Sequence, residues 1–157
     1  MSGKEAGSRD LARNRQAFHN YDIVDRYEAG MVLLGPEVKS LRAGKVQLRD
    51  AFARIEDGEL WLYDCHISPY AQHTHLTLTP IDPLRRRKLL MHRQEIHKLI
   101  GKVEEKGLTL VPLRVYLKNG RLKIELALAR GRRTYDKRDK LREKEMAREQ
   151  RRALKER

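Results

Sequence analysis

The side chains able to carry out chemistry in this chain are six histidines, one cysteine and 22 acidic residues, so their spacing decides what they can do. A metal site needs several such ligands at set spacings. His73 and His75 are close in the sequence, while His92 and His97 lie five residues apart at an expected helix start, which places them on different faces. No acidic residue completes either pair at ligand spacing. We therefore expect no metal site.

Motifs that would indicate an enzyme are also missing. The sequence has no Gly-rich phosphate loop, no Gly-x-Ser-x-Gly motif and no paired cysteines. A nuclease is disfavoured because no carboxylates cluster and no histidines are apposed. We expect no catalytic residues and no cofactor. The lone cysteine, Cys65, excludes an internal disulfide and fits a cytoplasmic protein.

Charge is the strongest global signal. Among 157 residues there are 35 Lys and Arg against 22 Asp and Glu, a formal net charge of +13. Such an excess indicates a polyanionic partner, nucleic acid first and an anionic membrane second. Residues 1–13 lack the apolar core of a signal peptide, and no apolar run is long enough to span a bilayer. We therefore expect RNA rather than a membrane.

The C-terminal residues 131–157 carry nearly half of this excess, with 12 Lys and Arg against 6 Asp and Glu. So few apolar side chains cannot offset the entropy of ordering, but the composition favours helix. We predict a tail that is disordered alone and helical when bound. Its first part ends at Arg138 and contains Tyr135, which could stack on a base or ribose. The alternative is a solubilising extension.

A second basic cluster is expected on a short helix that begins near Pro36 and ends before Gly44. Lys39 and Arg42 lie three apart on its polar face, followed by Lys45. The basic run Arg85-Arg86-Arg87-Lys88 is comparable. For both clusters we favour phosphate contacts, and the alternative is a solvated basic surface.

Glu28 stands in a basic setting just before the Ala29-Gly30 pair. It could form a local salt bridge, or it could accept a hydrogen bond from the amino edge of a base. A contact with a base gives sequence specificity that phosphate contacts cannot give. Aromatic residues also alternate along the expected strands. Most should belong to the core, and one or two could stack on bases. They are Tyr21, Tyr27, Phe52, Trp61 and Tyr63.

The elements that must position these residues are mostly strands. Alternating apolar residues predict strands over 21–27, 31–34, 51–55, 59–65, 113–118 and 121–128, with a hairpin turn at Asp57-Gly58 and a type I′ turn at Asn119-Gly120. Helical spacing appears from about Gln94 to Lys106. These elements, without a βαβ rhythm, predict a mainly β fold: a small antiparallel oligonucleotide-binding-like barrel with two or three peripheral helices. We expect a flexible N-terminal arm over residues 1–13, an RNA-binding barrel over 14–130 and the basic tail over 131–157.

The chain resembles the SmpB family of bacterial SsrA-binding proteins. The resemblance covers roughly residues 14–138 and rests on the stretches NRQAFH (14–19), YEAG (27–30), GPEVKSLRAGK (35–45), RKLL (87–90), GLTLVPL (107–113) and GRRTYDKR (131–138). It departs at Arg132 and Arg133, where the family often has lysines, and in residues 71–86, which lack the usual spacing.

The resemblance implies an adaptor without enzymatic activity. The barrel would bind the tRNA-like domain of transfer-messenger RNA as one monomer per RNA. The tail would enter the decoding centre and vacant mRNA channel of a stalled ribosome, in the process called trans-translation. By position, the implied RNA contacts are Asn14, His19, Tyr21, Glu28, Lys39, Arg42, Lys45 and Leu90, to which the basic run adds Lys88. The tail residues expected to act on the ribosome are Gly131, Arg132, Arg133, Tyr135, Asp136, Lys137 and Arg138.

The competing hypothesis is a general RNA- or ribosome-associated protein without selectivity for transfer-messenger RNA. Such a protein would show no preference for elbow-shaped RNA, and its affinity for RNA would fall steeply as the salt concentration rises.

Overall fold

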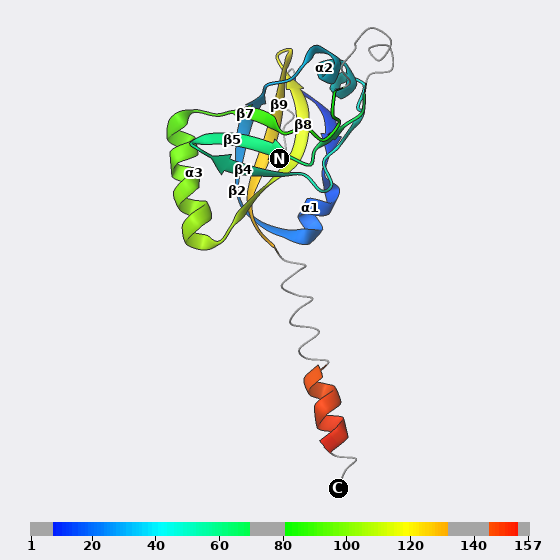
Figure 1. The fold of residues 1–157 in the computed structure, drawn as a ribbon, viewed down its shortest axis with the longest axis vertical. Helices are drawn as coiled ribbons and strands as arrows, with labels where there is room; N and C mark the ends of the chain where they lie inside the picture. Colours follow the sequence, from blue (N-terminus) through cyan, green and yellow to red (C-terminus); the bar gives the residue numbers. More distant parts are fainter. Residues whose placement is uncertain (1–7, 70–80, 132–144, 154–157) are drawn as a thin grey trace.

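The structure, a computed structural model, describes residues 8–69, 81–131 and 145–153. Seven antiparallel strands form a sheet in the order β1-β8-β4-β5-β7-β2-β9, and pairing of β8 with β9 closes it into a barrel (Figure 1). This confirms the predicted barrel with peripheral helices. The strands of the barrel are β1 (Ser8–Arg13), β2 (Tyr21–Met31), β4 (Phe52–Glu56), β5 (Glu59–Tyr63), β7 (Arg87–Leu90), β8 (Thr109–Lys118) and β9 (Arg121–Gly131).

Three helices surround the barrel. They are α1 (Arg15–Asn20), α2 (Gly35–Arg42) and α3 (Arg93–Lys106). The predicted end of α2 is confirmed, because Gly44 takes the left-handed conformation just past the helix, with φ of 73°. Gly107 does the same after α3, with φ of 60°. A separate two-stranded sheet pairs β3 (Val46–Gln47) with β6 (His66–Ile67).

The two predicted hairpins are confirmed. Asp57 and Gly58 have φ of 51° and 75° between β4 and β5, and Asn119 and Gly120 have φ of 51° and 76° between β8 and β9. Positive φ at both central residues is the requirement of a type I′ turn.

The N-terminal arm was predicted too long. Ser8–Arg13 is strand β1, which pairs with β8 from Ser8↔Lys118 to Arg13↔Arg114. The physical reason is that the outer edge of β8 needs hydrogen-bonding partners, and the polar sequence of β1 supplies them through its backbone.

The strand expected over 31–34 is not separate from the strand before it. Strand β2 runs unbroken through Gly30, its irregularity lies between Ile23 and Asp25, and the strand expected over 31–34 ends at Met31. Gly30 lies against β7: a Cβ on it would stand 3.4 Å from the Cβ of Leu90, in ordinary van der Waals contact.

The core fills the barrel with leucine and isoleucine. Leu60, Leu62, Leu126 and Ile124 are fully buried inside, and Leu99 of α3 covers one opening. A smaller cluster outside the barrel places Ala17 of α1 on Val111, Leu113, Ala127 and Ala129. This cluster fixes α1 against β8 and β9.

The tail is described in part. Residues 145–153 form a helix whose side chains are all exposed, as its composition favours. Gly131 ends β9, opposite Tyr21. The predicted ribosome contacts from Arg132 to Arg138 lie outside the described residues, so they and the predicted disorder of the free tail stay predictions.

Candidate nucleic-acid interface

A groove of about 590 Å³ lies where β2, β7 and β9 meet the start of α3. The pairing of Gly30 with Leu90 brings β2 and β7 together there, and Lys123 pairs opposite Gly30 from β9. Two residues implicated by sequence, Glu28 and Leu90, therefore share one groove. Its lining residues are Arg26, Tyr27, Glu28, Gly30, Leu90, Met91, His92, Glu95 and Lys123.

Glu28 is held as a carboxylate. The hydroxyl of buried Tyr116 donates to its Oε2, and Lys118 Nζ lies 3.4 Å from the same oxygen. The hydrogen bond from Tyr116 is the main cause of a pKa below the usual value, and Lys118 and Lys123 add to it. The local ion pair considered from sequence is thus present. Because 40% of the side chain remains exposed, Glu28 can still accept hydrogen bonds from a ligand.

Leu90 supplies the apolar part of the groove. It is 52% exposed on the outer side of β7, directly over the bare backbone of Gly30. An exposed leucine beside a fixed carboxylate offers a surface for a ribose or a base face, with an acceptor at its edge. This combination can recognise more than phosphate charge.

Sequence reasoning missed two cations of this groove. Arg26 lies 3.6 Å from Glu125, with its guanidinium 5.7 Å from the ring centre of Phe18. Lys123 lies on β9 next to buried Ile124. The alternation of polar and apolar residues placed Lys123 on the outer face, but the neighbouring strand could not be known from that pattern.

The residues implicated around α1 have different environments. Asn14 is only 5% exposed: its Nδ2 donates to the carbonyls of Leu48 and Pro112 at 3.1 and 3.0 Å, and its Oδ1 accepts from the Ala17 N–H. Direct RNA contact by Asn14 is therefore corrected to a structural role as the cap of α1. His19 is exposed in the last turn of α1, and half-buried Tyr21 packs on the α1 cluster.

The basic residues Lys39, Arg42 and Lys45 are all exposed on or just after α2. The helix is anchored by Glu37, which is buried and accepts from the Leu34 N–H at 2.9 Å and from Arg87 Nε at 2.6 Å. Burial would raise the pKa of Glu37, but hydrogen bonds led by that from Arg85 outweigh it and hold the pKa below its usual value.

The basic run before β7 is not the free phosphate-binding surface that sequence suggested. Arg87 is 0% exposed and also donates to the carbonyls of Cys65 and Pro83 at 2.6 and 3.0 Å. Arg85 pairs with Glu37. The physical reason is that buried Glu37 needs cationic partners. Lys88 remains half-exposed, 3.1 Å from Glu59.

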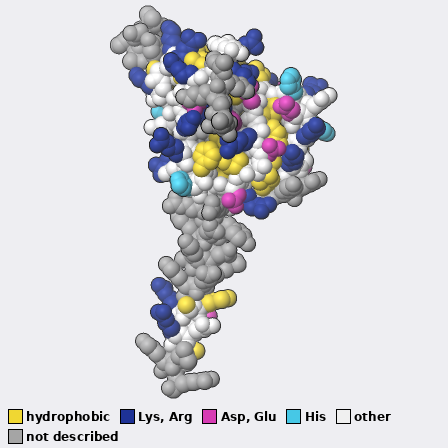
Figure 2. Space-filling model, turned by 180° about the vertical axis from the view of Figure 1, so that it is seen from behind, with side chains coloured by type: hydrophobic (Ala, Val, Ile, Leu, Met, Phe, Trp, Pro, Cys, Tyr) yellow, Lys and Arg dark blue, Asp and Glu magenta, His cyan; other side chains and the backbone are white. Residues whose placement is uncertain are grey.

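The candidate RNA-binding residues thus form three groups: those in the groove, those around α1, and those on or just after α2. Figure 1 places α1 near the end of the barrel where β9 leaves, and α2 at the opposite end. The face turned away in Figure 1 carries many Lys and Arg side chains, with a few acidic and apolar ones between them (Figure 2). Cations are therefore widespread, whereas the groove alone combines the two residues, Glu28 and Leu90, that offer more than charge.

Within the described residues, no cluster of His, Cys, Asp or Glu could hold a metal ion. In that part of the chain, no helix is both long enough and apolar enough to cross a membrane.

Comparison with known proteins gives consistent matches. A family described as SmpB protein matches residues 11–156. The SsrA-binding protein of Thermosynechococcus vestitus is 59% identical over 94% of this chain and 95% of its own length, and that of Sulfurihydrogenibium sp. is 57% identical over 88% and 90%. A solved chain described as "tmRNA-SmpB: a journey to the center of the bacterial ribosome" is 53% identical with a TM-score of 0.62, covering 76% of this chain and 82% of the other.

Proposed function

The chain belongs to the SmpB protein family, and from this premise we propose that it binds the tRNA-like domain of transfer-messenger RNA and delivers that RNA to stalled ribosomes. The homologues are SsrA-binding proteins, and the solved chain is described with transfer-messenger RNA and the ribosome. The proposed role is that of an RNA-binding adaptor and needs no catalytic step. It places the protein in the cytoplasm, where ribosomes work.

The observation that carries this proposal is the groove containing Glu28 and Leu90. Arg26 and Lys123 supply charge for the RNA backbone, while Glu28 supplies an oriented acceptor and Leu90 an apolar face. We propose that His19, Tyr21 and the α2 residues Lys39, Arg42 and Lys45 add contacts on either side. Because α1 and α2 lie toward opposite ends of the barrel in Figure 1, contacts on both sides of the groove suit a folded RNA bound by one monomer.

We propose that residues 131–157 act separately, on the decoding centre and the empty mRNA channel. The segregated charge of the tail and the exposed helix over 145–153 support this division. A body bound to the RNA and a tail bound to the ribosome would strengthen each other through avidity.

Competition binding tests the proposal. Labelled tRNA-like domain is bound to the full chain and challenged with unlabelled domain or bulk tRNA, for the parent and for Glu28→Gln, Leu90→Ser and the control Glu104→Gln. We expect bulk tRNA to compete poorly, the two groove variants to bind about tenfold more weakly, as loss of one specific contact predicts, and the exposed α3 control to match the parent. Equal competition by bulk tRNA would instead indicate a general RNA-binding protein.

A further inference from the structure

Trp61 occupies an unusual position on the outer face of the barrel. It lies between two cations, because Arg54 on β4 and Lys88 on β7 are its direct cross-strand partners. A third cation, Arg86, places its guanidinium carbon 4.1 Å from the centre of the indole ring. One half-buried aromatic ring is thus surrounded by three positive side chains.

The acidic residues nearby hold these cations only weakly. Arg86 is 3.3 Å from Glu56, and Lys88 is 3.1 Å from Glu59, but the side chains of Arg86 and Lys88 are 53% and 39% exposed. Exposed ion pairs of this kind contribute little to stability and are screened by salt. Phosphate groups can therefore take the place of either carboxylate.

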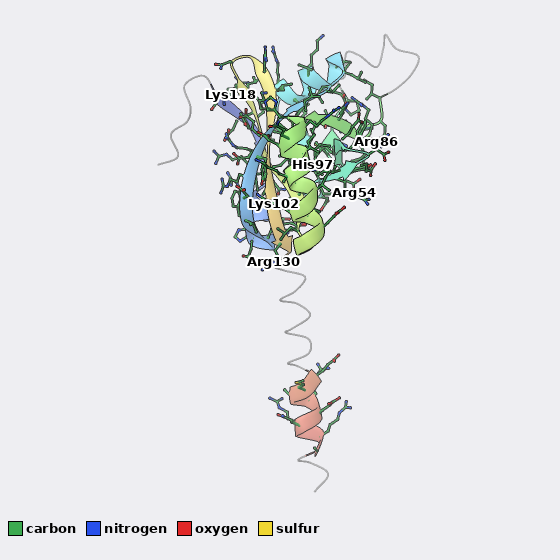
Figure 3. The ribbon with its side chains drawn as sticks, turned by 90° about the vertical axis from the view of Figure 1, so that its left-hand side faces the viewer. Arg54, Arg86, His97, Lys102, Lys118 and Arg130 are labelled. Carbon is green, nitrogen blue, oxygen red and sulfur yellow. The ribbon has the colours of Figure 1, made fainter. Side chains whose placement is uncertain are left out.

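The position of Trp61 on the barrel also favours a nucleic-acid ligand. Oligonucleotide-binding barrels bind their ligands across an outer face of adjacent strands, and Trp61 stands on the outer face of β5 between its neighbours β4 and β7. Figure 3 shows Arg54 and Arg86 on the same side of α3. Along the outer side of β7, Lys88 is followed by Leu90, which lines the proposed RNA groove.

We propose that Trp61 with Arg54, Arg86 and Lys88 forms a stacking site for one unpaired nucleotide, continuous with the groove and resting on the RNA-binding function proposed above. The incoming base replaces the Arg86 guanidinium over the indole, and Arg86 turns to a phosphate. Arg54 and Lys88 contact the phosphates on either side. Stacking of this kind is tolerant of sequence, because every base has a π-face. The ligand is an unstacked loop or bulge nucleotide of the bound RNA.

The chain offers a clean optical test, because Trp61 is its single tryptophan. The full chain is titrated with the tRNA-like domain while two signals are followed: anisotropy of the labelled RNA, which reports binding, and tryptophan emission, which reports stacking. We expect emission to be quenched in step with binding. RNA bound by anisotropy with unchanged emission would overturn the stacking site and leave the proposed function standing. No binding by anisotropy would overturn both.

Variants separate stacking from folding. Trp61→Leu should bind the RNA roughly tenfold more weakly, whereas Trp61→Phe, which keeps a ring, should stay within about threefold. Arg86→Gln should reduce the salt slope by about 0.7 to 0.9, and the exposed α3 control Lys98→Gln should leave it unchanged. If Trp61→Leu is less stable to urea but binds with the parent affinity, the pair with Arg86 is purely structural and the proposal is wrong.

Discussion

Replacing Tyr116 with phenylalanine tests how the groove fixes its carboxylate. Tyr116 is 2% exposed, and its hydroxyl donates to Oε2 of Glu28. Burial, followed by the hydrogen bond to Glu28 and then by its charge, raises the pKa of Tyr116, so the hydroxyl stays protonated as a donor. Arg114 covers the ring with its guanidinium 4.1 Å from the ring centre and is itself held by Asp10 of β1 at 2.8 Å. The donor is thus rigid, and Tyr116→Phe removes it with little change of shape.

The expected loss of stability depends on how much of the Glu28 side chain is exposed to water. A hydrogen bond to a charged group contributes about 1.5–3 kcal/mol, but Glu28 is 40% exposed, so water replaces part of the loss. We expect unfolding free energy to fall by about 1 kcal/mol. We expect RNA affinity to fall by roughly fivefold, because Glu28 loses the partner that orients it.

The Tyr116→Phe variant should also raise the pKa of Glu28. The depressed pKa means that this carboxylate adds stability above its usual value of 4.5 and loses it as pH falls through the lower pKa of the folded state. Without the Tyr116 hydroxyl, the pKa of Glu28 rises toward 4.5, so the carboxylate is protonated at a higher pH than in the parent. A carbon-detected NMR titration of Glu28 measures this shift.

A matched control is Tyr63→Phe, which removes a similar hydroxyl bond, 2.6 Å from Glu56, outside the groove. It should cost comparable stability without shifting the pKa of Glu28. If Tyr116→Phe leaves both RNA affinity and the Glu28 pKa at parent values, Tyr116 does not position the carboxylate and the reasoning is refuted.

Three further predictions follow from the same contacts. Asn14→Ala should lower the unfolding free energy in urea by about 2–3 kcal/mol, since it removes the cap of α1 and the two hydrogen bonds donated to the carbonyls of Leu48 and Pro112; an unchanged midpoint would contradict this. Arg87→Met should cost about 3–5 kcal/mol because buried Glu37 keeps only one of its two cationic partners, Arg85, and the carbonyls of Cys65 and Pro83 lose a donor; parent-like thermal stability would argue against that pairing. Truncation after Arg130 should leave affinity for the tRNA-like domain nearly intact and abolish tagging in a reconstituted translation reaction; equal loss of both would show that the tail and barrel are not separate.

Elements encoded by neighbouring residues were predictable from sequence. The Asp57-Gly58 and Asn119-Gly120 turns fix their hairpins through local backbone conformation, and helix α3 is defined by its own apolar spacing and by Gly107. Strand β1 was not predictable in this way. Its sequence is polar, and its pairing with β8 depends on a partner more than a hundred residues away.

The residues of the candidate site likewise divide into those that the sequence could identify and those whose environment depends on distant segments. Glu28 and Leu90 were identified through the family resemblance, and the pairing of β2 with β7 explains why they act together. Arg87 had seemed a phosphate ligand because a run of cations looks exposed in sequence, whereas its burial depends on Glu37, fifty residues earlier. Asn14 was misjudged for a similar reason, since its carbonyl partners come from distant segments.

Sequencing the RNA that copurifies with the full chain from bacterial cells tests the central claim most directly. The account predicts that transfer-messenger RNA is enriched far above its share of total RNA, and that Glu28→Gln reduces this enrichment while Glu104→Gln does not. Recovery of tRNA and ribosomal RNA in proportion to their abundance, unaltered by Glu28→Gln, would contradict selective binding through the groove.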